Sequence, residues 1–196
     1  MRVTSHLVLW MLGLAQAETQ TSAEERGCLA RHAAGRKRIV EIGSWHGVSS
    51  ACLRLAMASD GELICVDPYP AGRLRFSAQR LIALREVSKV RNGKVRWVRM
   101  TGADAGRHFA ASGEAAIDFV FIDGDHSYEG LREDWEAWSG LVAAGGLVAL
   151  HDSCSSAARR IDHAGSVIYT RDAIMRDPRF RLIERVDTLS VLERIA

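Results

Sequence analysis

Acidic and imidazole side chains stand directly after five short apolar runs of this 196-residue chain. Each run has the character of a buried strand, and a parallel sheet brings the carboxyl ends of its strands to one edge, where ligands bind. Carboxylates and imidazoles gathered there can bind hydroxyl groups, hold a divalent cation or move a proton near neutral pH. The five strand ends carry the segments Glu41–Gly47, Asp67–Pro70, Gly102–Asp104, Asp123–His126 and His151–Ser153.

The turn after the first strand bears on the kind of cofactor. A dinucleotide-binding fold would show glycines in the pattern GxGxxG, which let backbone amides approach a pyrophosphate. Here Gly43 and Gly47 are four positions apart, and Trp45 and His46 fill the space between them. Asp67, at the end of the next strand, is placed to accept hydrogen bonds from ribose hydroxyls, although alone it could be a turn former. Together these residues favour an adenosine ligand without a pyrophosphate.

The elements that must position these residues alternate regularly along the chain. Ser22 and Glu25 form a capping box that begins a helix ending near residue 35. Strands separated by helices predict an α/β fold with a doubly wound, mainly parallel sheet of seven strands. The last two strands are separated by too little chain for a crossover, so we expect them to pair antiparallel at the C-terminal end. Strands are predicted over 38–43, 63–67, 95–100, 119–123, 147–152, 180–187 and 189–195, and helices over 48–58, 73–90, 103–111, 128–142 and 166–176.

The composition is that of one globular domain without a strong charge preference. Hydrophobic residues make up 47% and charged residues 26% of the chain, and the formal net charge is +2. This near balance gives no broad attraction to nucleic acid or to an anionic membrane, so we expect neither as a partner. Four cysteines without a CxxC pair indicate a reduced, cytoplasmic protein.

The first 17 residues admit two interpretations. Arg2, the apolar run from Leu7 to Leu14 and the small residues at 15–17 together resemble a secretory signal. The alternative is a structural first helix, because the run is too short to span a membrane. We favour the helix, since an adenosine cofactor points to the cytoplasm, and an apolar helix there would suit the contact of a homodimer.

Three motifs carry a resemblance to a known family. The segment Glu41-Ile-Gly43-Ser-Trp45-His46-Gly47, the acid Asp67 and the segment from Phe121 to Gly130 resemble class I S-adenosylmethionine (SAM)-dependent methyltransferases. The resemblance covers about residues 36–155 and is strongest to the branch with the macrocin and mycinamicin sugar O-methyltransferases. It implies a Rossmann-like methyltransferase domain over 36–196, with 1–35 as a helical segment that covers the cofactor or the acceptor.

The resemblance also implies which residues bind SAM. Gly43 would pack against the methionine part of the cofactor, and Asp67 would hold the ribose. Asp104 would accept a hydrogen bond from the exocyclic amine of adenine. The expected cofactor contacts are Glu41, Gly43, Trp45, Ser49, Asp67, Ala103, Asp104 and Asp123.

A divalent metal site is implied in the same way. Asp123, His151 and Asp152 fall at the positions that hold the metal in metal-dependent O-methyltransferases, where both closing positions carry oxygen ligands. Magnesium prefers oxygen ligands, and it is the metal we expect first. The imidazole at 151 shifts the preference toward manganese or another transition metal. Alternatively, His151 only hydrogen-bonds to its neighbours, with or without a metal.

His126 falls at the position of the base in the macrolide-sugar enzymes. An imidazole with a pKa near 6.5 can accept a proton at neutral pH, whereas the simpler alternative is that His126 caps the next helix.

The expected function is methyl transfer to a hydroxyl of a small molecule (a sugar, polyketide or diol), with His126 and Asp123 as catalytic residues. Arg73 and Arg75 could bind an acidic acceptor. Metal-independent N- or C-methyl transfer and a non-catalytic SAM-binding regulator are the alternative functions.

Overall fold

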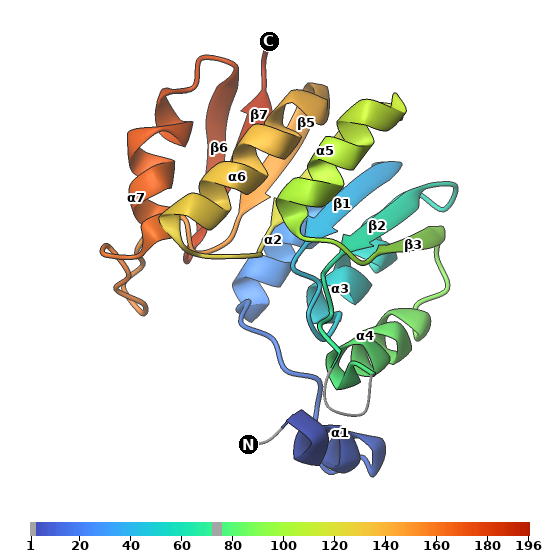
Figure 1. Ribbon diagram of the computed structural model, residues 1–196. Helices are drawn as coiled ribbons and strands as arrows, with labels where there is room; N and C mark the ends of the chain where they lie inside the picture. Colours follow the sequence, from blue (N-terminus) through green and yellow to red (C-terminus); the bar gives the residue numbers. More distant parts are fainter. Residues whose placement is uncertain (1–2, 72–75) are drawn as a thin grey trace.

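A seven-stranded sheet runs through the computed structural model, which describes residues 3–71 and 76–196, and helices cover both of its faces (Figure 1). The strand order is β3-β2-β1-β4-β5-β7-β6. The first five strands pair parallel to one another, which confirms the predicted doubly wound α/β fold. The strands are β1 (Arg38–Ile42), β2 (Glu62–Val66), β3 (Lys94–Val98), β4 (Ile117–Ile122), β5 (Val142–Leu150), β6 (Phe180–Val186) and β7 (Leu189–Arg194).

The helices divide between the two faces of the sheet. One hydrophobic cluster joins side chains of α2 and α3 to one face, and another joins α5, α6 and α7 to the opposite face. The predicted helix over 73–90 begins at Ala78, and residues 73–75 lie outside the described residues, as does the acceptor role suggested for Arg73 and Arg75. The helices are α1 (Val3–Met11), α2 (Ala23–Ala33), α3 (Val48–Ala56), α4 (Ala78–Ser88), α5 (Gly102–Ser112), α6 (Tyr128–Trp138) and α7 (Gly165–Asp172).

The start of β5 differs from the prediction. The sequence predicts a helix to residue 142 and a strand from 147, but α6 ends at Trp138 and β5 already begins at Val142. Ile117 pairs with Val142 and Phe119 with Leu147, so the residues between form a bulge in β5. Gly145 has a φ of +75°, a conformation that glycine adopts without strain. Gly145 and Gly146 are therefore part of a bulged strand and not of a connection before it.

The C-terminal strands form the expected antiparallel pair, but their order in the sheet is not the order of the chain. β7 inserts between β5 and β6 and is antiparallel to both. The turn before β7 therefore lies beside the carboxyl end of β5. This arrangement brings Thr188 next to His151 and Asp152.

One buried tryptophan fixes the helix that borders the site. Trp138, at the end of α6, is fully buried and packs against Phe109 of α5 with ring centroids 5.2 Å apart. Its indole Nε1–H donates to the backbone oxygen of Gly102, 2.8 Å away. This bond holds α6 against the first turn of α5 and therefore against the loop that follows β3.

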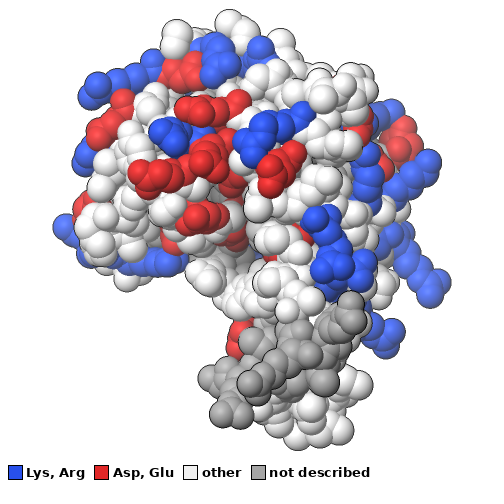
Figure 2. Space-filling view, viewed as in Figure 1, with Lys and Arg blue, Asp and Glu red and all other residues white. Residues whose placement is uncertain are grey.

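The N-terminal segment packs on the body of the protein at two places. α2 contributes Cys28 and Leu29 to the core beneath β1, whereas α1 packs through Leu7 on Ile82 of α4. α1 itself carries no Asp, Glu, Lys or Arg, and Figure 2 shows the described part of it as a projection without these residues. In the described part of the chain, no helix combines the length and apolarity needed to cross a bilayer. The division of the chain at residue 35 stays a prediction.

Candidate active site

A pocket of about 590 Å³ opens at the carboxyl ends of the parallel strands. The loops after β1, β2, β3 and β4 form its walls, and Gln20 from the segment between α1 and α2 closes one side. This volume is that of a small-molecule site. Of the residues expected to bind SAM, the pocket is lined by Gly43, Trp45, Asp67, Ala103 and Asp123.

The loops after β1 and β2 are held together by Asp67. Its Oδ2 accepts from the backbone N–H of Trp45 at 2.9 Å, and its Oδ1 accepts from that of Tyr69 at 2.8 Å. Burial raises the pKa of Asp67, although these two hydrogen bonds act in the opposite direction. Each carboxylate oxygen keeps a second lone pair, so Asp67 can still accept hydrogen bonds from a ligand in the pocket.

Gly43 is required where the backbone of β1 meets that of β4. Its φ is +88°, and a Cβ at this position would overlap the backbone oxygen of Asp123. The two strand ends therefore approach more closely than any other residue would allow. This contact places the Asp123 side chain at the wall of the pocket.

Glu41 and Ser49 are buried but do not line the pocket. Complete burial raises the pKa of Glu41 to about 7, although the hydroxyls of Ser49 and Ser50 lower it in part. Ser50 donates its hydroxyl hydrogen to Glu41 Oε2, and Oε1 has no partner among the described residues. The contacts with SAM expected for Glu41 and Ser49 stay predictions.

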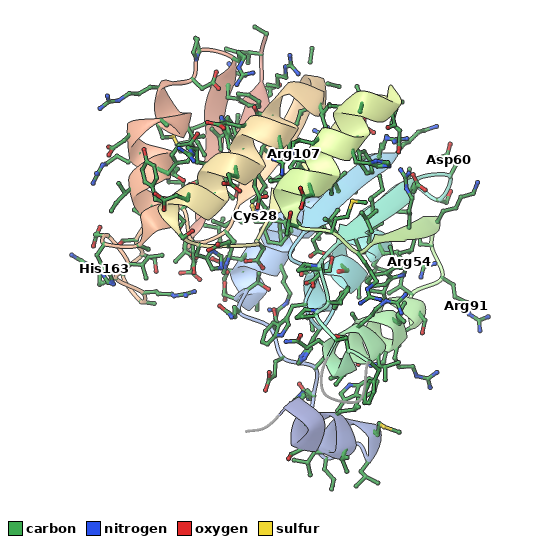
Figure 3. The ribbon with its side chains drawn as sticks, viewed as in Figure 1. Cys28, Arg54, Asp60, Arg91, Arg107 and His163 are labelled. Atoms are coloured by element: carbon green, nitrogen blue, oxygen red, sulfur yellow. The ribbon has the colours of Figure 1, made fainter. Side chains whose placement is uncertain are left out.

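Asp104 also lies away from the pocket lining. It accepts hydrogen bonds from the Thr101 hydroxyl at 2.7 Å and from Arg107 at 2.6 Å, both in the first turns of α5. These bonds lower its pKa. Figure 3 shows Arg107 on α5. The contact with adenine expected for Asp104 stays a prediction, and its carboxylate already has two partners.

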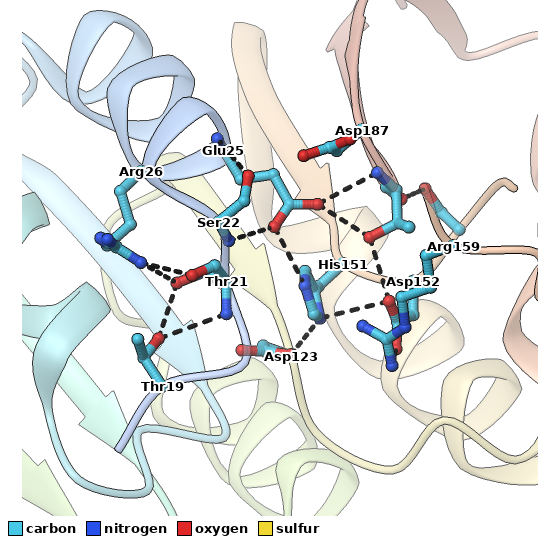
Figure 4. Close-up of polar contacts among 12 residues, drawn as sticks. Thr19, Thr21, Ser22, Glu25, Arg26, Asp123, His151, Asp152, Arg159 and Asp187 are labelled. Carbon is cyan, nitrogen blue, oxygen red and sulfur yellow. Dashed lines mark hydrogen bonds and ion pairs between the residues drawn. The ribbon is translucent and has the colours of Figure 1, made fainter. Parts of the chain in front are cut away.

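His151 is surrounded by carboxylates from three parts of the chain (Figure 4). Its Nδ1 lies 2.8 Å from Asp123 Oδ1 and 3.8 Å from Asp152 Oδ1, and its Nε2 lies 3.4 Å from Glu25 Oε2. The carboxylates lie off the directions of the ring N–H bonds, so these contacts are ion pairs rather than aligned hydrogen bonds. Burial alone would lower the pKa of His151, but the carboxylates raise it to about 10.

Glu25 is a site residue that the local sequence pattern does not reveal. The pattern predicts Glu25 only as part of the capping box, and Glu25 does accept from the backbone N–H of Ser22 at 2.8 Å. Its other oxygen accepts from the backbone N–H and the hydroxyl of Thr188 at 3.0 and 2.8 Å. Burial would raise its pKa, but the contacts with His151, Ser22 and Thr188 lower the pKa to about 2. No local pattern could reveal this role, because the partners come from β5 and β7.

Asp152 is occupied by partners other than a metal. Arg159 Nη2 lies 2.8 Å from its Oδ2, and the Thr188 hydroxyl, whose single hydrogen is shared with Glu25, lies 3.0 Å from its Oδ1. At this site, the ligand atoms of Asp123, His126 and His151 lie within 4.8 Å of one another. One carboxylate and two imidazoles suit a transition metal better than magnesium. The structure thus brings two of the three predicted ligands, Asp123 and His151, together beside His126.

His126 faces the pocket, unlike His151. Its side chain is 34% exposed, and its Nε2 lies 3.6 Å from Asp123 Oδ1. The cap of α6 is the neighbouring Ser127, whose hydroxyl accepts from the backbone N–H of Gly130 at 3.0 Å. His126 is therefore free of the capping role and can reach a molecule in the pocket, which the fully buried His151 side chain cannot.

Known proteins resemble this chain in sequence and in fold. A family described as "Methyltransferase domain" matches residues 40–153. Tricin synthase 1 from rice (Oryza sativa subsp. japonica) is 32% identical over 112 residues, which are 54% of this chain and 42% of the rice protein. The O-methyltransferase TomG from Streptomyces achromogenes, solved in complex with SAM, superposes over all of this chain and 91% of TomG with a TM-score of 0.67 at 18% identity. An O-methyltransferase from Bacillus cereus, solved in complex with S-adenosylhomocysteine (SAH), covers 98% of this chain and 90% of its own with a TM-score of 0.65 at 17% identity.

The chain belongs to this methyltransferase domain family, and its fold is that of the class I SAM-dependent methyltransferases. It spans about two fifths of the length of the rice relative. The structural likenesses, at 18% and 17% identity, concern the fold alone. The macrocin and mycinamicin branch stays a prediction.

Proposed function

We propose that this protein transfers the methyl group of SAM to a hydroxyl oxygen of a small molecule. The observation that carries the proposal is the position of His126, an accessible imidazole beside Asp123 at the wall of a cofactor-sized pocket. TomG and the Bacillus cereus protein, which share the fold, are both described as O-methyltransferases, and they were solved with SAM and SAH. The acceptor class we favour is a hydroxylated metabolite such as a sugar, a polyketide or a diol.

SAM would lie across the loops after β1 to β4. Asp67 would accept hydrogen bonds from the ribose, and the loop with Gly43 and Trp45 would hold the methionine part. Ala103 would border the adenine at the start of α5. The pocket then leaves the methyl group on the side where Asp123 and His126 lie.

His126 would act as the general base. It takes the proton of the acceptor hydroxyl, the oxygen forms a bond to the methyl carbon, and the carbon–sulfur bond breaks so that SAH leaves. Asp123, 3.6 Å from the His126 Nε2, stabilises the imidazolium that forms. The remainder of the rate enhancement comes from aligning oxygen, carbon and sulfur in the pocket.

A divalent metal fits the donor set at this place. Asp123 and His151 would hold it, and His126 lies within reach of the same position. For Asp152 to bind as predicted, its carboxylate must release Arg159 and Thr188. A bound metal would supply a positive charge that lowers the pKa of the acceptor hydroxyl.

The test is a methyl-transfer assay with labelled SAM and a panel of hydroxylated metabolites, with chelator and with added magnesium or manganese. We expect His126→Ala to lower turnover by about 10²- to 10⁴-fold, less at high pH, with SAM affinity unchanged. Asp123→Asn should lower turnover and recover partly at high metal concentration. His108→Ala, at an exposed position of α5, is the matched histidine control. Full activity of His126→Ala together with turnover that chelator leaves unchanged would refute the metal–base mechanism.

Two further features belong to this proposal. We expect a cytoplasmic protein, because SAM is supplied there. We also expect a homodimer through the exposed apolar side chains of α1 and the residues after it, and light scattering of the full chain measures this. These side chains are Val8, Met11, Leu12 and Leu14.

A further inference from the structure

α6 carries a buried acid that neither the metal site nor the proposed base uses. The side chain of Asp134 lines the pocket, yet the residue is only 5% exposed. Within the described residues, its carboxylate has neither a hydrogen bond nor an ion pair, and its charged neighbours are the acids Asp125 and Glu133. A carboxylate that lines a pocket without a protein partner is stabilised by a donor that a ligand brings.

The carboxylate lies between the loops that follow β3 and β4. A Cβ at Gly102 would overlap Asp134 Oδ1, and a Cβ at Gly124 would lie 3.1 Å from Oδ2. Both neighbours are glycines, so the carboxylate faces the pocket between two stretches of bare backbone. The bond from Trp138, one turn further along α6, holds the helix at this distance. The position of the carboxylate is therefore set by the fold and not by a flexible loop.

We propose that Asp134 binds the amine edge of the adenine ring of SAM, the contact that the sequence resemblance assigns to Asp104. This inference rests on the proposed SAM cofactor. Asp134 borders Gly102, the neighbour of Ala103, where we place the adenine. Asp104 does not line the pocket, and its carboxylate accepts from Thr101 and Arg107. Asp134 is thus a carboxyl group without a partner among the described residues, and it lies at the end of the pocket where we place the adenine.

The chemistry of the two groups is complementary. The edge of adenine presents a donor, the 6-amino group, next to an acceptor, N1. A neutral carboxyl group offers a carbonyl oxygen and an O–H in the same arrangement, whereas a carboxylate offers only acceptors. Burial and the nearby carboxylates of Asp125 and Glu133 raise the pKa of Asp134 to about 7. The charged and titratable side chains that line the pocket with it are Asp67, Asp123, Asp125, His126 and Glu133, with neither Lys nor Arg in this described lining.

The test measures binding of two probes to the full chain by calorimetry. One probe is SAH, and the other is the SAH analogue that lacks the 6-amino group of adenine. The wild-type protein should bind SAH about 10- to 100-fold more tightly than the analogue. Asp134→Ala should weaken SAH binding by a similar factor and bind both probes alike, because the partner of the amine is gone.

Two matched variants separate this role from a structural one. Asp134→Asn keeps a carbonyl oxygen and an N–H, so it should retain SAH affinity to within a few-fold and still prefer SAH to the analogue. Asp104→Ala, which removes the other candidate acceptor, should bind both probes as the wild-type protein does. The inference is overturned if Asp134→Ala keeps the wild-type preference for the 6-amino group, or if Asp104→Ala loses it. A wild-type protein that binds neither probe would overturn the SAM proposal as well, which distinguishes the two failures.

Discussion

Replacing Glu25 by Gln tests whether the buried ion pairs around His151 stabilise the fold. The pKa of Glu25 is lowered from 4.5 to about 2, against the effect of burial, by His151, Ser22 and Thr188. One unit of pKa corresponds to about 1.4 kcal/mol, so this lowering of the pKa contributes about 3 kcal/mol to the free energy of unfolding at neutral pH. Removing one partner of a buried ion pair costs about 3–5 kcal/mol, which agrees in size. We therefore expect the variant to lose about 3 kcal/mol at pH 7.

The sign of the pH dependence follows from the lowered pKa. Between the two pKa values, the folded protein binds fewer protons than the unfolded chain. The contribution of Glu25 to the free energy of unfolding is therefore complete above about pH 4.5, and it disappears as the pH falls toward 2. At pH 3 the difference between wild type and variant should shrink to about 1 kcal/mol. Urea unfolding in the presence of chelator, over this pH range, measures the difference.

Glu24→Gln is the control, because Glu24 is exposed in the same first turn of α2. It should change stability by less than about 0.5 kcal/mol. If Glu25→Gln is as stable as the control at pH 7, or loses the same amount at pH 3 as at pH 7, the reasoning about the ion pairs is wrong.

Three further predictions concern the pocket. Asp67→Ala should weaken SAM binding by about 1.5–3 kcal/mol in calorimetry, because the ribose loses a charged acceptor, and unchanged affinity in a folded variant would remove the ribose assignment. Gly43→Ala should lower the free energy of unfolding by about 2 kcal/mol or more, since a Cβ there overlaps the backbone of Asp123; a neutral result in urea unfolding would contradict the close approach. Asp134→Asn should be more stable than the wild-type protein at pH 8, by at most about 4 kcal/mol. The pKa of Asp134 is raised to about 7 in the folded protein, so the wild-type protein loses stability as the pH rises from 4 to 7, and the Asn variant does not. A stability gap that stays constant over this range would show that Asp134 is not the titrating group.

Much of the fold could be predicted because its signals are local. The alternation of apolar runs with amphipathic segments identified the five parallel strands and the helices between them, and the short connection before residue 189 identified the antiparallel pair. The bulge at the start of β5 could not be predicted in the same way. The adjacent Gly145 and Gly146 are equally compatible with a turn and with a bulge, and the pairing of Ile117 with Val142 decides between the two.

The candidate site was predicted where each residue follows a strand. Asp123 and His126 meet at the pocket because the carboxyl ends of parallel strands share one edge of the sheet, a consequence of topology that the strand pattern already contains. His151 also arrives there, next to Asp123. The sequence by itself therefore determined the fold class and which residues reach this edge.

Only the tertiary structure decided what those residues contact. Glu25 meets Thr188 across 163 positions of the chain, because β7 inserts beside β5 and α2 packs over the same strand ends. In the same way, Arg159 occupies Asp152, and a helix that follows β4 places Asp134 next to a loop that follows β3. Such contacts depend on how distant elements pack in three dimensions, and neither periodicity nor local spacing along the chain carries that information.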